Sequence, residues 1–131
     1  MILHHGMNEN TFQDALGFIF DMDGTLIDSH ESHYRAWDRI VREHGEPHEK
    51  SDIVRHFGKT TPDIAMALLG ELDRETLTSI SETKARYFIQ EIPASQVIPG
   101  AVSLLRVIKN MDKGICLASS NFNFVIKEVI K

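Results

Sequence analysis

The apolar run over residues 16–20 ends abruptly at Asp21-Met22-Asp23-Gly24-Thr25. Because the run is unbroken and contains aromatic and β-branched members, it predicts a strand that is buried on both faces. Residues 114–118 repeat this pattern and run into three small polar residues, 119–121. The sequence therefore predicts two similar strands, each followed by polar side chains at its carboxyl end, where open parallel sheets gather their ligands.

The segment between the two strands shows helical rather than strand spacing of its apolar residues. Trp37 belongs to the first such group, and further groups lie within 64–72 and 77–88. Ile92 precedes a proline, which biases it away from helix and ends this segment. Another helix is expected after Gly100, and one more after residue 122. The order strand, helices, strand, helix predicts an α/β fold with parallel strands joined by a crossover.

Composition limits the kind of partner that the chain can bind. Lys and Arg total 14 against 19 Asp and Glu, a net charge of −5 with neutral His, which argues against nucleic-acid binding. The globular composition also argues against a membrane protein.

Cys116 is the sole cysteine, which excludes an internal disulfide and favours a cytoplasmic location. Residues 1–10 lack a signal-peptide pattern and are interpreted as a polar leader, with metal binding by His4 and His5 the less favoured alternative.

Asp21 and Asp23 form a carboxylate pair at the predicted end of the first strand. Two carboxylates about 4 Å apart repel by roughly 4 kcal/mol at an effective dielectric of 20, so such a pair favours a bound cation or a shared proton. Mg²⁺ is the natural candidate, because it prefers oxygen ligands and joins carboxylates to substrate phosphate. Gly24 allows the sharp turn that would aim both side chains into one crevice. An Asp-rich turn followed by helix-capping residues is the alternative that the residues leave open.

Residues 17–29, GFIFDMDGTLIDS, resemble the first motif of the haloacid dehalogenase-like hydrolase superfamily, an apolar strand leading into Asp-x-Asp-Gly-Thr. The resemblance implies that Asp21 is the nucleophile that becomes an aspartyl-phosphate, and that Asp23 is the general acid and base. It also implies a Mg²⁺ ion held by the carboxylate of Asp21 and the backbone carbonyl of Asp23. The second aspartate favours phosphate-ester chemistry over cleavage of carbon–halogen bonds.

Ser119 resembles the second motif of the same family, a Ser or Thr that hydrogen-bonds the transferring phosphoryl group. Ser120 and Asn121 would then add backbone N–H donors at the start of the last helix, whose dipole also favours an anion. Taken alone, a Ser-Ser-Asn sequence before a helix is more often simply an N-cap, and the presence of Asp21 beside it is what favours phosphate binding.

Residues 28–37 resemble the entry to the helical cap of the β-phosphoglucomutase-like subfamily. His33 matches a histidine that is thought to position the catalytic acid when the cap closes; an exposed helix histidine is the alternative.

A second candidate segment is Gly58-Lys59-Thr60-Thr61. It lacks the glycine that a phosphate-binding P-loop needs five positions earlier, where Ile53 stands. It resembles instead the cap loop that faces the active site, so Lys59, Thr60 and Thr61 are candidate substrate contacts. A solvated loop with a helix cap is the alternative.

These resemblances imply an incomplete Rossmann-like parallel core, residues 1–29 and 93–131, with an inserted helical-bundle cap at 30–92. The third and fourth motifs of the family are not found after Ser119, so the chain is expected to be truncated and weakly active or inactive alone. The expected function is a Mg²⁺-dependent phosphatase acting on a small phosphorylated metabolite, a sugar or polyol phosphate.

Two alternatives remain open from the sequence. The first is a phosphosugar mutase, although the mutase has basic residues in its cap loop where this chain has Phe57 and Thr61. The second is a non-catalytic fragment that forms a homodimer through exposed sheet edges.

Overall fold

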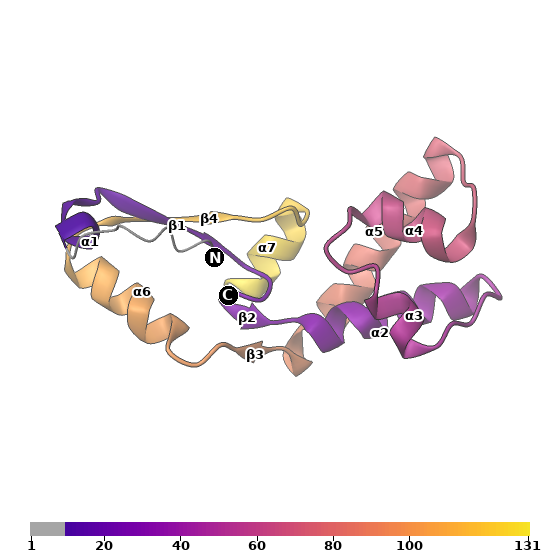
Figure 1. Ribbon diagram of the computed structural model, residues 1–131, viewed down its shortest axis with the longest axis horizontal. Helices are drawn as coiled ribbons and strands as arrows, with labels where there is room; N and C mark the ends of the chain where they lie inside the picture. Colours follow the sequence, from indigo (N-terminus) through magenta and orange to yellow (C-terminus); the bar gives the residue numbers. More distant parts are fainter. Residues whose placement is uncertain (1–9) are drawn as a thin grey trace.

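The computed structural model describes residues 10–131, so the predicted leader over residues 1–9 lies outside the described residues. The molecule is elongated, with a small parallel sheet at one end and a group of helices at the other (Figure 1). We call this group, residues 30–91, the helical insert. The chain enters and leaves it close to the middle of the molecule (Figure 1).

The parallel sheet consists of β1 (Gly17–Asp21) and β4 (Gly114–Ala118). The register pairs Gly17 with Gly114 and Asp21 with Ala118, so both strands end at the same edge. The connection returns through α6 (Ala101–Asn110), which packs against β4. The α/β fold and the parallel pairing predicted from the sequence are therefore confirmed.

The prediction that the first strand is buried on both faces is wrong for this chain. Side chains alternate across the sheet, and only one face receives partial cover. Phe18 on that face is half-buried and contacts Phe12 of the preceding segment, which includes α1 (Asn10–Asp14), with 4.6 Å between ring centroids. Leu16 is 93% exposed and Ile19 75% exposed. The reason is that a sheet of two strands with one neighbouring helix leaves one face without a packing layer.

A second, smaller sheet joins the two ends of the helical insert, and the sequence analysis did not predict it. Here β2 (Ile27–Asp28) pairs in antiparallel fashion with β3 (Gln96–Val97). The Ile98 N–H also donates to the Leu26 carbonyl, at 2.9 Å. These contacts hold the entry and exit of the helical insert side by side, next to the turn that carries Asp23.

Four α-helices form the helical insert, and a 3-10 turn (Ile92–Ala94) follows it. The first and last of them lie against each other over much of their length. The helices are α2 (His30–Glu43), α3 (Lys50–Val54), α4 (Thr61–Leu69) and α5 (Arg74–Glu91).

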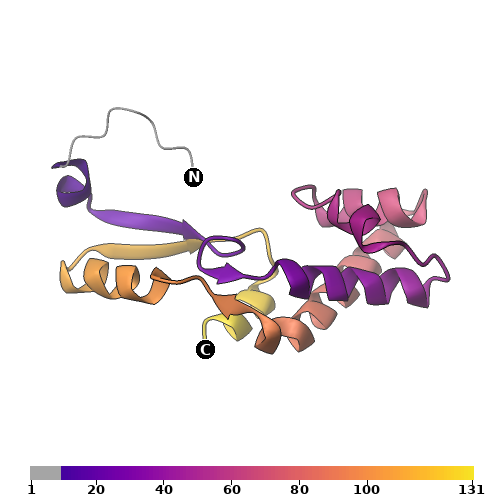
Figure 2. The same ribbon diagram turned by 60° about the horizontal axis from the view of Figure 1, so that its bottom comes forward.

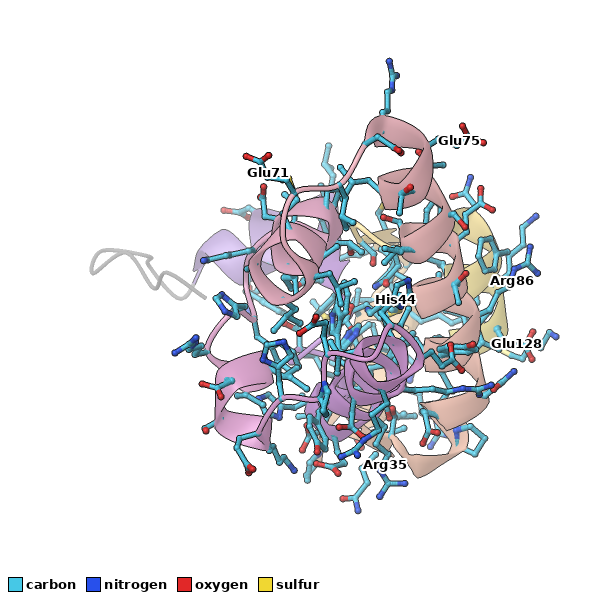
Figure 3. The ribbon with its side chains drawn as sticks, turned by 90° about the vertical axis from the view of Figure 1, so that its right-hand side faces the viewer. Arg35, His44, Glu71, Glu75, Arg86 and Glu128 are labelled. Atoms are coloured by element: carbon cyan, nitrogen blue, oxygen red, sulfur yellow. The ribbon has the colours of Figure 1, made fainter. Side chains whose placement is uncertain are left out.

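The helical insert has its own hydrophobic core, built from apolar residues at helical spacing. Ile40, Val41 and Ile53 are fully buried there. The other buried members are Trp37, Ile64, Ala65, Leu68 and Ile80. Charged side chains such as Glu71, Glu75 and Arg86 point outward from this end of the molecule (Figure 3). No helix within residues 10–131 is long and apolar enough to cross a membrane.

The last helix, α7 (Asn123–Val129), connects the parallel sheet to the helical insert. It lies beside the carboxyl-terminal part of α5 (Figure 2). Val125 of α7 is fully buried in a second apolar cluster with Ala36, Ala85 and Phe88 of the insert. This cluster sets the position of the insert relative to the carboxyl ends of β1 and β4.

Candidate functional site

The two aspartates lie where β1 turns into β2. Gly24 adopts a positive φ of 73°, and the Met22 carbonyl accepts N–H bonds from residues 25, 26 and 27. Met22 itself is 1% exposed. Met22 is buried, whereas Asp21 before it is exposed and Asp23 after it is half-buried, so both aspartates remain accessible from outside the core.

Asp21 is exposed at this edge. Its Oδ1 accepts the Met22 N–H at 2.8 Å, and within residues 10–131 its Oδ2 makes no hydrogen bond. The register of β1 and β4 places Asp21 opposite Ala118, so Ser119 follows at the same edge. Asp21 and Ser119, the residue predicted to bind phosphate, thus stand at the same edge of the sheet, and neither is among the residues that line the cavity described below.

Asp23 is held by three side chains, two from the start of α2 and one from the turn after β4. Its Oδ1 accepts hydrogen bonds from Ser29 Oγ at 2.5 Å and from His33 Nε2 at 3.0 Å. Its Oδ2 accepts the Asn121 side-chain amide at 2.6 Å. Burial alone would raise the pKa of Asp23, but the hydrogen bonds from His33, Ser29 and Asn121 stabilise the anion and lower that pKa to about 2.

His33 bridges Asp23 to a buried lysine. Lys84 Nζ lies 2.7 Å from His33 Nδ1, and Lys84 is only 7% exposed. Since a lysine ammonium has no acceptor, Nδ1 must accept and Nε2 must carry the proton that it donates to Asp23. Burial lowers the pKa of His33 below its usual value despite the bond to Asp23, which keeps the imidazole neutral. Burial likewise lowers the pKa of Lys84 to about 8.

Lys84 is a site residue that was not predicted from the sequence. The signal that could have found it is the spacing of α5, because Lys84 lies four residues after Ile80 and four before Phe88, on the buried stripe of that helix. A lysine at such a position loses most of its hydration and needs a polar partner, which His33 provides.

Ser119, Ser120 and Asn121 form the turn between β4 and α7. Ser119 Oγ accepts the Asn121 backbone N–H at 3.2 Å and its side-chain amide at 3.0 Å. The N-cap of α7 is Phe122, without a side-chain cap, so the alternative in which this turn serves as an N-cap is wrong. Of the three residues, Ser120 and Asn121 line a cavity, described next.

A cavity of about 410 Å³ lies between the carboxyl edge of the sheet and the helical insert. Lys59 and Thr61 line its insert side, and Lys59 Nζ lies 3.3 Å from His56 Nδ1. Thr60 is the N-cap of α4, accepting the Asp63 N–H at 3.3 Å, and is not among the lining residues. The full lining is Asp23, Gly24, Asp28, Ser29, His30, His33, Trp37, Phe57, Gly58, Lys59, Thr61, Ile64, Lys84, Ser120 and Asn121.

The donor atoms near Asp21 are of the type that binds Mg²⁺, but they are too few to complete a metal site. The Asp21 carboxylate and the Asp23 backbone carbonyl are oxygen donors of the kind that Mg²⁺ prefers. Within residues 10–131, however, no group of three or more His, Cys, Asp or Glu side chains is arranged to hold a metal ion. The described residues can therefore supply only part of a metal site.

Comparison with known proteins identifies relatives of this arrangement. The model of the haloacid dehalogenase-like hydrolase family matches residues 16–131. Hexitol phosphatase A of Escherichia coli (strain K12) is 36% identical over 101 residues, which are 68% of this chain and 41% of that protein. Validoxylamine A 7'-phosphate phosphatase of Streptomyces hygroscopicus subsp. limoneus is 28% identical over 94 residues, 71% of this chain and 44% of that protein.

A solved structure shows the same fold. A hydrolase from Pseudomonas syringae superposes with a TM-score of 0.72 at 25% identity, covering 87% of this chain and 52% of that chain. The present chain thus spans about two-fifths of the length of the curated relatives given above and about half of this structure.

Proposed function

Because the chain belongs to the haloacid dehalogenase-like hydrolase family, we propose that it supplies the nucleophile and the acid–base group of a phosphatase acting on a small phosphorylated metabolite. The observation that carries this proposal is the placement of Asp21, exposed, two residues before an Asp23 carboxylate whose oxygens both accept hydrogen bonds. The names of the two curated relatives support a sugar or polyol phosphate as the substrate class.

In the proposed reaction, Asp21 Oδ attacks phosphorus and the bond from phosphorus to the leaving oxygen breaks. Asp23, which is ionised in the free chain, first takes up a proton from solvent and gives it to that oxygen, which leaves as an alcohol. Asp23 then takes a proton from water, whose oxygen attacks the aspartyl-phosphate and releases Asp21 and phosphate. Ser29, His33 and Asn121 orient the Asp23 carboxylate for both steps, which lowers the entropic cost of each.

The remaining assignments concern the turn after β4, the insert side of the cavity and the carboxyl edge of the sheet. Ser119 Oγ and the Ser120 N–H would hold the transferring phosphoryl group, joined by the Asn121 N–H when it exchanges its bond to Ser119 Oγ for one to phosphate. Lys59 and Thr61 are proposed substrate contacts on the insert side. Mg²⁺, held by the Asp21 carboxylate and the Asp23 carbonyl, would neutralise charge on the phosphoryl oxygens when bound. Because residues 10–131 hold no group of three or more ligating side chains, we expect the Mg²⁺ affinity and the activity of this chain alone to be low.

The test is formation of a phosphoryl mimic at Asp21, which requires no turnover. The chain is incubated with Mg²⁺ and beryllofluoride and followed by ¹⁹F NMR, together with a hydrolysis assay on p-nitrophenyl phosphate. We expect a bound ¹⁹F signal that Asp21→Asn abolishes and that Asp112→Asn, a matched exposed aspartate outside the cavity, leaves intact. A signal that persists in Asp21→Asn would exclude Asp21 as the nucleophile.

The exposed strand residues favour a second candidate function, self-association. Ile19 lies on the open face of the sheet, Leu16 is exposed just before β1, and each strand has an unpaired edge within the described sheet. Such edges and faces promote pairing between chains. Light scattering over a concentration series is expected to show dimers that Ile19→Lys weakens. A monomer at all concentrations would reject this candidate.

A further inference from the structure

His30 occupies a part of the cavity wall that the proposed chemistry leaves without a role. It is the first residue of α2 and lines the cavity, next to Ser29, which holds Asp23. Its ring meets the Phe57 ring edge to face, with 5.0 Å between centroids and 64° between planes. Phe57 belongs to the loop before α4, so this contact lies on the insert side, while Ser120 and Asn121 lie on the sheet side.

The two histidines that line the cavity differ in the hydrogen bonds of their ring nitrogens. Both ring nitrogens of His33 are engaged, by Asp23 and by Lys84. Among the hydrogen bonds of residues 10–131, none involves a ring nitrogen of His30. His30 therefore offers polar ring atoms at the cavity wall to a ligand.

The residues around His30 suit a ligand with a hydroxylated carbon chain better than a ligand with a second phosphate group. A neutral imidazole has one donor and one acceptor nitrogen, the same combination that a hydroxyl group has. Phe57, Trp37 and Ile64 add apolar wall to the same cavity, against which C–H groups pack. Lys59, which lies in the same loop as Phe57, has its ammonium close to His56, and Lys84, the other lysine of the cavity wall, contacts His33.

We propose that His30 is a specificity-determining residue, which hydrogen-bonds a hydroxyl of the leaving group of a polyol or sugar phosphate. This inference rests on the proposed function and deepens it. The Phe57 ring holds the His30 ring at the wall, so the hydrogen bond forms without a large loss of side-chain entropy. The phosphoryl group itself binds at the Asp21 edge and does not depend on His30.

The experiment compares two ligands on the same chain. In ¹H–¹⁵N NMR titrations with Mg²⁺, the dissociation constants of sorbitol 6-phosphate and of inorganic phosphate are measured separately. His30→Phe keeps an aromatic ring against Phe57 but cannot hydrogen-bond a hydroxyl, and we expect it to weaken sorbitol 6-phosphate binding about five- to tenfold. His30→Gln keeps a donor and an acceptor and is expected to stay within about twofold of the wild type. Phosphate binding stays unchanged in both variants.

His44→Phe is the matched control, because His44 follows the carboxyl end of α2 at the outer end of the helical insert, seen from outside in Figure 3. It is expected to change neither constant. If His30→Phe weakens both ligands equally, or neither, the role of His30 is overturned while the proposed function stands. If the wild-type chain binds neither ligand, the proposed function falls and this inference falls with it.

Discussion

The imidazole ring of His33 lies flat on the Phe88 ring, with 4.1 Å between centroids and 5° between planes. Phe88 also belongs to the apolar cluster in which Val125 of α7 is buried. The packing of α7 against the helical insert therefore reaches the side chain that donates to Asp23. The helical insert, the parallel sheet and Asp23 are therefore connected through side-chain contacts. Each of these contacts can be tested separately.

Replacing His33 by Asn should destabilise the fold, because the shorter side chain leaves Lys84 buried without its acceptor. An unsatisfied buried polar group costs about 1–3 kcal/mol. We expect a loss of this size in the free energy of unfolding measured with urea. In a double-mutant cycle with Lys84→Met, the two changes should couple by about 0.5–3 kcal/mol, since the residues are in contact. Additive effects would contradict the bond between them.

The burial of Lys84 predicts a pH dependence of stability. Its pKa is about 8 in the folded chain and about 10.4 in an unfolded one. Between these values the unfolded chain binds a proton that the folded chain lacks, so this lysine makes the free energy of unfolding rise with pH. Below pH 8 the proton is bound in both states and the contribution is flat.

Lys84→Met removes that contribution and provides the control for all other titrating groups. The stability of wild type relative to Lys84→Met should increase by up to about 3 kcal/mol between pH 7 and pH 10.5. Urea unfolding of both proteins across this range measures it. A difference that stays constant with pH would show that the amine is not desolvated.

Val125→Ala tests the contact between α7 and the helical insert. Removing two buried methyl groups should lower the free energy of unfolding by about 2 kcal/mol, from lost burial and the cavity left behind. Val102→Ala on α6 is the matched control, because Val102 is 43% exposed, and it should cost less than about 0.5 kcal/mol. Equal effects would mean that α7 does not pack on the insert in solution.

Gly17→Ala and Gly114→Ala form a paired test of the parallel sheet. A Cβ at Gly17 would lie 2.9 Å from the Gly114 carbonyl oxygen, whereas a Cβ at Gly114 would meet its nearest atom at 3.7 Å. We expect Gly17→Ala to destabilise the fold by about 1–3 kcal/mol through overpacking of the backbone. Gly114→Ala should be nearly neutral. Thermal unfolding of both variants distinguishes this register from a shifted one, in which the two substitutions would be equivalent.

Local sequence patterns determined the elements of this protein and the kind of chemistry that it can carry. The apolar run before Asp21 predicted β1, and the helical spacing of apolar residues around Trp37 and Ile40 predicted the first insert helix. Such predictions work because the spacing of buried side chains along a segment follows the period of its backbone. The Asp-x-Asp-Gly-Thr turn pointed to the site, since carboxyl ends of parallel strands meet at one edge.

Tertiary structure alone decided which side chains meet at that site. Lys84 lies 51 residues after His33, and Asn121 lies 98 residues after Asp23, distances along the chain that no local period can relate. The exposure of Ile19 was also a tertiary outcome, because a strand is buried on both faces only where other layers pack on it. Side-chain period is a property of each segment, whereas burial and partner choice depend on how the segments pack together.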